Sequence, residues 1–259
     1  MNGESRASSA APSESTVQVW LSPRYLLAFI CLSAILGIGH ELGHHVVGFI
    51  TCGAWGYKTF NSFRLAEGCA QRHPSTYWLA TLAGPVLFNY LPMCVGFFRM
   101  RRPDAGSKLF GLSLVFATIP ILRIVFSALH ANDEPWIVRL LFGRSAVAFW
   151  TMNVAIWLVT GPPLVLAWKT IQRRHRLLLF LFYMLGLPIF VFLLVGLVLE
   201  NLVTKQHFLA DTLWGMPYLV LITEGLAYFG YHHYRKYLSM PRSRIELEHE
   251  RERELPAGA

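Results

Sequence analysis

Charged side chains are scarce in this sequence, and their scarcity excludes an ordinary soluble domain. Asp, Glu, Lys and Arg make up 15% of the 259 residues, whereas hydrophobic residues make up 54% and the mean hydropathy is +0.42. A chain of this length and composition can supply several membrane-spanning helices, each of about 20 mainly apolar residues. The sequence therefore predicts an all-α fold, a polytopic helix bundle in a membrane.

Acidic residues are fewer than basic ones, 15 against 23, which leaves a net charge of +8. A basic balance can indicate nucleic-acid binding, but here Lys and Arg lie mainly between apolar runs and near the C-terminal end. That distribution is typical of topology signals that face anionic lipid. We therefore expect the lipid bilayer as a partner and no nucleic acid.

Cysteines are few, and none of the four stands in a CxxC pair, which excludes a cysteine zinc knuckle. Cys31 and Cys94 lie in apolar runs and are expected to be packing residues. Cys52 and Cys69 flank a polar segment, and a disulfide between them can form only if that segment faces an oxidising compartment.

Six apolar runs define the expected architecture of about six transmembrane helices. A transmembrane domain is expected over residues 24–235, between a disordered tail at 1–23 and a charged tail at 236–259. Weak alternation from Lys58 to Leu65 predicts a short hairpin-like segment between the first two helices. The runs cover approximately residues 24–50, 75–98, 108–129, 146–168, 177–199 and 209–231.

The loops give an orientation for these six helices. The loops after the second and fourth runs, and the segment after the sixth, carry more Lys and Arg than the loops on the opposite side. The positive-inside rule then places both termini in the cytoplasm. The first and third runs point in the same direction, so their C-terminal parts lie at the same face of the membrane.

The first run contains an HExxH motif, His40-Glu41-Leu42-Gly43-His44. Residues four apart share a face of a helix, so both imidazoles can reach one metal ion, and Glu41 can act as a general base on water. An ionisable group at membrane depth costs at least about 2.5 to 3.5 kcal/mol, which makes such groups candidates for a functional site. The motif therefore predicts a metal site, with Zn²⁺ as the expected metal.

A catalytic zinc site usually has three protein ligands and one open position. Asp133 is our first choice for the third ligand, because it follows the third run at the same membrane level as the motif. Glu134 is a close rival, and Asp211 and Glu224 are weaker ones. The alternative for Asp133 is a helix-capping role.

Other apolar runs also contain polar residues. In the second run, Ala83-Gly84-Pro85 predicts a kink or close helix packing, and Asn89 follows about one turn later. Asn89 could orient a peptide carbonyl or form an interhelical hydrogen bond. Arg123, in the third run, needs an acidic or carbonyl partner, and we expect Glu224 to be that partner.

Together, the HExxH motif, Ala83-Gly84-Pro85 and Asn89 give the chain a resemblance to the site-2 protease family of intramembrane zinc metalloproteases, over about residues 25–134. The resemblance implies that His40 and His44 bind zinc, that Glu41 activates water, and that Asn89 holds the substrate backbone or the developing oxyanion. It also implies that the substrates are single-span membrane proteins, cut within the bilayer.

The chain departs from this family in three respects. The family's Asp-Gly motif for the third ligand is absent in that form, so Asp133 is assigned by position. No PDZ-like domain is inserted, which leaves substrate selection to the loops or to a regulatory membrane partner. His40 lies about 24 Å along a helix from Arg24, toward the outer face, whereas family members often hold the metal near the cytoplasm.

Two other functions are alternatives. His40, His44 and His45 also spell one histidine box of the membrane desaturases and hydroxylases, but no second such pair of histidines occurs in the sequence. The other alternative is a non-catalytic zinc-binding membrane scaffold or transporter, in which Glu41 would be dispensable because only hydrolysis needs a base beside the metal.

Overall fold

The computed structural model describes residues 16–19, 21–172, 174 and 176–241. The expected tails lie mostly outside these residues. Within them the chain is largely helical, and five helices are long and apolar enough to cross a membrane. This confirms the all-α polytopic bundle, although the described residues contain five such helices where about six were expected. The five are Pro23–Cys52, Trp78–Met100, Ala105–Ala128, Ala146–Thr170 and Arg176–Thr204.

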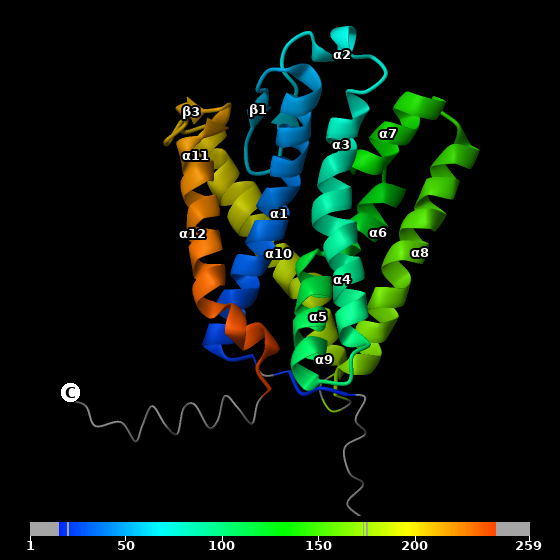
Figure 1. The fold of residues 1–259 in the computed structure, drawn as a ribbon, viewed down its shortest axis with the longest axis vertical. Helices are drawn as coiled ribbons and strands as arrows, with labels where there is room; N and C mark the ends of the chain where they lie inside the picture. The colour runs from blue at the N-terminus through cyan, green and yellow to red at the C-terminus, as the bar shows by residue number, and fades with distance from the viewer. Residues whose placement is uncertain (1–15, 20, 173, 175, 242–259) are drawn as a thin grey trace, which may run out of the picture.

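Helix α1 (Pro23–Cys52) is the central helix of the bundle (Figure 1). It begins where the Ser22 side chain accepts a hydrogen bond from the Tyr25 N–H, with Pro at the first helical position. It ends at Gly53, which has a φ of 69° and suits the left-handed cap of a helix. Thirty residues make a helix about 45 Å long, enough to span a bilayer and extend beyond it.

The second membrane crossing is one rod of three segments that packs along α1. Its middle segment is π-helical and starts at Pro85, where the missing N–H disturbs the regular hydrogen-bond ladder. Of the kink or close helix packing predicted at Ala83-Gly84-Pro85, the structure shows close packing at Gly84, together with the change to a π-helix. The segments are α3 (Trp78–Gly84), η1 (Pro85–Tyr90) and α4 (Leu91–Met100).

The third crossing, expected from Lys108 to about Leu129, is present over Ala105–Ala128, but it is interrupted. The chain forms α5 (Ala105–Ala117) and α6 (Pro120–Ala128), separated by a break at Thr118. Ile119 takes a left-handed backbone with a φ of 49°, which interrupts the helix just before a proline. The carbonyl of Thr118 is thereby left for a partner from another helix.

Helix α7 is short, and α8 is the fourth crossing. Helix α8 starts at a Ser145 side chain that accepts from the Ala148 N–H, and Pro162 and Pro163 lie inside it. It packs against α4, α6 and α7. Their bounds are Asp133–Phe142 for α7 and Ala146–Thr170 for α8.

The fifth crossing, residues 176–204, alternates α-helical and π-helical segments. A short hairpin follows it, and only then does the last long helix begin. Leu209 was expected to start a sixth span, but the hairpin occupies this stretch and the helix starts at Tyr218, so that boundary was wrong. The elements are α9 (Arg176–Leu181), η3 (Phe182–Gly186), α10 (Leu187–Val191), η4 (Phe192–Leu199), α11 (Glu200–Thr204), β3 (Thr212–Leu213), β4 (Met216–Pro217), α12 (Tyr218–Tyr234) and η5 (Arg235–Ser239).

A second hairpin lies at the same end of the bundle, between α1 and α3. Strands β1 (Tyr57–Lys58) and β2 (Phe63–Arg64) pair antiparallel, which confirms the hairpin predicted between the first two helices. Both hairpins, α2 (Cys69–Arg72) and α7 gather at this end, whereas the described chain begins and ends at the other (Figure 1).

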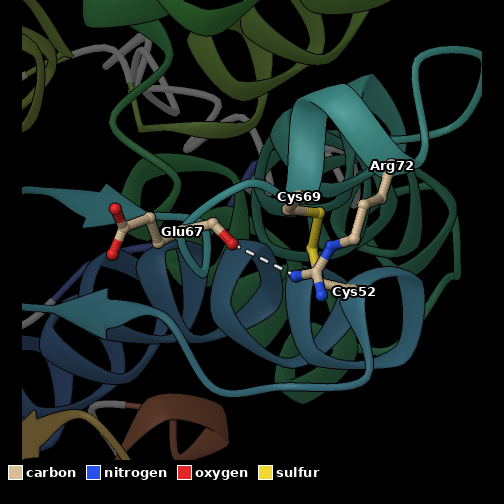
Figure 2. Close-up of a disulfide and its surroundings, with 4 residues drawn as sticks. All are labelled: Cys52, Glu67, Cys69 and Arg72. Atoms are coloured by element: carbon tan, nitrogen blue, oxygen red, sulfur yellow. Dashed lines mark hydrogen bonds between the residues drawn. A yellow bond between two sulfur atoms is a disulfide. The ribbon is translucent and has the colours of Figure 1, made fainter.

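A disulfide closes the segment that carries β1 and β2. Cys52, at the end of α1, is bonded to Cys69, at the start of α2, with 5.4 Å between their Cα atoms (Figure 2). Beside it the Arg72 guanidinium donates to the Glu67 carbonyl at 3.1 Å. The segment from Gly53 to Gly68 is thus fixed at both ends.

The hairpin is further anchored by two half-buried carboxylates, one from α11 and one from α12. The Lys58 ammonium, fully buried, donates to Glu224 at 2.7 Å. Glu200 accepts from the Thr59 hydroxyl and from the Phe60 N–H. The expected pair of Arg123 with Glu224 was therefore wrong, because Glu224 is used by Lys58.

Packing extends into the segment before α1. The Val17 N–H donates to the Thr170 carbonyl, and Val17 is buried against the end of α8. Ordered contacts therefore reach into the stretch expected to be a tail, while residues 1–15 lie outside the described part of the chain.

Candidate metal centre

Three ligand atoms, from α1 and α7, converge close to the β1–β2 hairpin. The Nε2 atoms of His40 and His44 are 3.0 Å apart, and the Oδ2 atom of Asp133 is 3.0 Å from the first and 3.7 Å from the second. Ligands at about 2.0 to 2.1 Å from a tetrahedral zinc lie about 3.3 Å from one another. This His-His-Asp group could therefore hold a metal ion.

The group forms because three elements meet. Helix α1 presents both imidazoles on one face, as residues four apart must be. Asp133 reaches them from the first turn of α7, which the break between α5 and α6 and the turn after α6 bring back toward α1. Both histidines are buried, at 6% and 0% exposure.

The second nitrogen of each ring is already engaged, and this leaves Nε2 for a metal. His44 Nδ1 lies 2.8 Å from the carbonyl oxygen of Ala80, which can only accept, so Nδ1 donates there. His40 Nδ1 lies 2.7 Å from Asn89 Oδ1, while the Asn89 amide nitrogen donates to the Thr118 carbonyl. Such contacts orient metal-binding histidines and fix their tautomer.

With these tautomers, the centre contains three acceptors facing one another and no hydrogen among them. Two Nε2 lone pairs and a carboxylate oxygen repel unless a cation lies close by. The donor set of two imidazoles and one carboxylate is one that zinc accepts in catalytic sites. The residues present therefore fit a bound divalent metal.

Asp133 is suited to be the anionic ligand. The Arg123 guanidinium donates to its Oδ2 at 3.2 Å, and a nearby positive charge favours the ionised carboxylate. The carboxylate is thus ionised at neutral pH, as a metal ligand must be.

An arginine lies next to the three ligand atoms. Arg123 places Nη2 3.3 Å from His40 Nε2 and Nη1 3.2 Å from Asp133 Oδ2. Nη1 also lies 3.4 Å from each carboxylate oxygen of Glu134, which in turn accepts a 2.6 Å hydrogen bond from the Tyr90 hydroxyl. The true partners of Arg123 are therefore the two acidic residues at the start of α7.

Glu41 is the group of the motif that remains free. It makes no hydrogen bond and no ion pair within the part of the chain that the structure describes. It borders a cavity of about 680 Å³ together with His40, Asn61, Arg123 and Asp133, and a smaller one of about 170 Å³ on the other side. Glu41 can therefore act on a molecule in either cavity.

Close packing of α1 against α3 and the hairpin holds the centre in place. A Cβ atom on Gly84 would lie 2.5 Å from two atoms of the His44 ring and 2.7 Å from the His40 carbonyl oxygen. On its other side the His44 ring stacks on Phe63 of β2, at 4.3 Å between centroids. The glycine of the Ala-Gly-Pro motif therefore makes room for a ligand side chain.

The other acidic candidates lie elsewhere. Glu134 is tied to Arg123 and Tyr90, and Glu224 to Lys58. Asp211 is exposed next to β3. His45, next to His44 in sequence, bonds the Trp214 carbonyl at 2.8 Å and faces away from the centre.

The sequence pattern did not reveal the role of Arg123 beside the ligands. The available signal was its position: Arg123 is one charged residue in an apolar run and lies ten residues before the acidic pair Asp133-Glu134.

Comparison of the chain with models of protein families, with curated proteins and with solved structures found no match.

Proposed function

We propose that this protein is an intramembrane zinc metalloprotease, which hydrolyses peptide bonds within the transmembrane segments of single-span membrane proteins. The observation that carries the proposal is the convergence of His40, His44 and Asp133 beside a free Glu41, on a helix that crosses the membrane. Polar groups of this kind are costly in a membrane and are retained for function.

Each residue has a part in this reaction. Zinc held by His40, His44 and Asp133 would lower the pKa of a water molecule and polarise the substrate carbonyl. Glu41 takes the proton from the attacking water and returns it to the leaving amine. Asn89 keeps the His40 ring in the orientation that presents Nε2.

The larger cavity supports a peptide substrate. At about 680 Å³ it lies in the usual range of ligand sites, and its wall combines polar groups with Phe63, Leu65, Tyr77 and Trp136. A transmembrane segment must unwind locally to enter the cavity, because the N–H and C=O groups of a peptide bond in a helix are engaged in backbone hydrogen bonds. We therefore expect substrates with helix-destabilising residues near the cleaved bond.

The test is cleavage of fluorescent single-span peptides, with and without a Gly-Pro pair in the span, by protein reconstituted in lipid vesicles. Wild type is expected to cleave the Gly-Pro peptides, and Glu41→Gln is expected to be at least about 100-fold slower because the general base is lost. Glu67→Gln is the matched control, since Glu67 is exposed at the surface and away from the centre.

Removal and return of the metal complete the test. A chelator should stop cleavage and added zinc should restore it. If Glu41→Gln cleaves as fast as wild type, the protease proposal is wrong, and a non-catalytic zinc protein or another chemistry must replace it.

A further inference from the structure

We infer that Arg123 is a further catalytic residue of this centre, whose guanidinium binds the oxygen that becomes negative when the peptide carbonyl is attacked. The inference rests on the proposed function and adds to it a group that the HExxH motif does not contain. It follows from the contacts of Asn89 and Arg123.

Asn89, the residue expected to hold the oxyanion, has both ends of its amide engaged. Its Oδ1 accepts from His40 Nδ1 at 2.7 Å, and its Nδ2 donates to the Thr118 carbonyl at 3.1 Å. Its side chain is buried at 7% exposure. The break between α5 and α6 thus supplies the acceptor that keeps the Asn89 amide turned toward His40, and the role of oxyanion donor needs another residue.

Arg123 has the required position. It borders both cavities together with His40 and Glu41, so its guanidinium and the general base face the same space. Its Nη2 lies 3.3 Å from His40 Nε2, the nitrogen that faces Asp133 and His44. A carbonyl group close to the three ligand atoms is therefore also close to Arg123.

The donors on Nη2 become available when the centre is loaded. A neutral imidazole has one lone pair on Nε2, which can accept from Arg123 or bind a metal, but not both. Nη1 keeps its contacts with Asp133 and Glu134 in either case, so the guanidinium stays anchored. The N–H groups of Nη2 then need a new acceptor, and the cavity is where a substrate oxygen enters.

The contacts with Glu134 also hold the Arg123 guanidinium in one position. Glu134 is itself held by the Tyr90 hydroxyl at 2.6 Å, which fixes the carboxylate that positions Arg123. A preorganised donor aimed at a developing negative charge acts strongly in a site that excludes water, and losing one such donor costs about 100- to 1,000-fold in rate. Arginine is also permanently charged, so its contribution does not depend on pH.

The experiment compares two probes on zinc-loaded protein purified in detergent. One is an apolar peptide with a phosphonamidate in place of a peptide bond, which carries tetrahedral, negatively charged oxygens. The other is the same peptide ending in a thiol, which binds zinc through sulfur and has no such oxygens. Dissociation constants and zinc content are measured for wild type, Arg123→Gln, Arg123→Lys and a control, Arg139→Gln, on the exposed side of α7.

We expect Arg123→Gln to bind the phosphonamidate about 100-fold more weakly than wild type while its affinity for the thiol peptide changes less than about 3-fold. Arg123→Lys keeps the charge beside Asp133 and Glu134 and should lose about 10-fold for the phosphonamidate alone, because an ammonium cannot reproduce the planar fork. Arg139→Gln should bind both probes as wild type does.

Two results would overturn the inference. Equal losses for both probes, or loss of zinc from both Arg123 variants, would mean that Arg123 only holds Asp133 in place. Unchanged phosphonamidate affinity would remove it from the site altogether. Failure of the wild type to bind zinc or the phosphonamidate would be a different result, since it overturns the proposed function itself.

Discussion

At the scale of single residues, the chemistry of this centre depends on which nitrogen of each histidine is engaged elsewhere. Ala80 and Asn89 both accept from Nδ1 atoms, and so both Nε2 lone pairs face the same point. Residues that orient metal ligands in this way matter nearly as much as the ligands themselves. Asn89 is therefore expected to act on metal affinity through His40.

Replacement of Asn89 tests this role. Asn89→Ala should weaken zinc binding by about 10- to 100-fold, because His40 loses the acceptor that orients its ring. Asn89→Asp keeps an acceptor for Nδ1 and should bind zinc closer to wild type. Zinc affinity is measured by competition with a chelator of known strength. Unchanged zinc affinity together with lost cleavage would show that Asn89 contacts the substrate and not His40.

The spacing of residue types predicted two of the three candidate ligands, and position along the chain predicted the third. The HExxH spacing identified His40 and His44, because helix geometry alone fixes how they lie. Asp133 was assigned from its expected membrane level, and it lies beside them. Arg123 was given the wrong partner, because a single sequence contains no distances between helices and Lys58, in the hairpin, competes for Glu224.

At the scale of elements, the irregular segments carry the site. The break at Thr118 supplies a carbonyl to Asn89, and the π-helical segment after Gly84 carries Asn89 itself. Helical breaks at membrane depth are tolerated where they are enclosed by protein or line a cavity. Both border the smaller cavity, which contains Asn89 and Thr118 in its wall.

The contact of Gly84 with the ligands gives a second prediction. Alanine normally favours a helix over glycine by about 1 kcal/mol, yet Gly84→Ala should weaken zinc binding at least about 10-fold, because the new methyl group collides with the His44 ring. Gly225→Ala in α12 is the matched control, since nothing lies within 4 Å of its added Cβ.

Zinc titration of the two glycine variants tests whether Gly84 is needed for zinc binding. The control should bind zinc as wild type does. Equal zinc affinity in wild type, Gly84→Ala and Gly225→Ala would mean that the His44 ring can move aside, and that close packing at Gly84 does not hold the centre.

Apolar runs predicted most long helices but not where they are interrupted. The run from Lys108 to Leu129 is apolar on both sides of its break, where only Thr118 and Pro120 flank the left-handed Ile119. The stretch after Leu209 reads as apolar but forms a hairpin, because Gly215, with a φ of 74°, allows the turn between β3 and β4. Periodicity and hydropathy do not detect either feature.

At the scale of the whole molecule, the site, both hairpins and the disulfide lie toward one end, and the described chain begins and ends at the other (Figure 1). Disulfides persist in oxidising compartments, whereas basic loops stay in the cytoplasm. The loop between α4 and α5 carries Arg101 and Arg102 at the end opposite the disulfide. Both signals therefore favour an outward-facing metal centre with cytoplasmic termini.

Thiol labelling tests this orientation. Denatured protein should expose two thiols before reduction, from Cys31 and Cys94, and four after it. In intact cells, a membrane-impermeant maleimide should label Arg144→Cys, between α7 and α8, but not Arg102→Cys. The reverse labelling pattern would invert the orientation, and four thiols before reduction would remove the argument from the disulfide.

The most direct measurement of the central claim is the zinc content of detergent-purified wild type, Glu41→Gln, His44→Ala, Asp133→Ala and the exposed control Asp211→Ala. The account predicts close to one zinc per chain in wild type, Glu41→Gln and Asp211→Ala, and its loss from His44→Ala and Asp133→Ala. Iron in place of zinc, no metal in the wild type, or full zinc in Asp133→Ala would contradict a centre built from His40, His44 and Asp133.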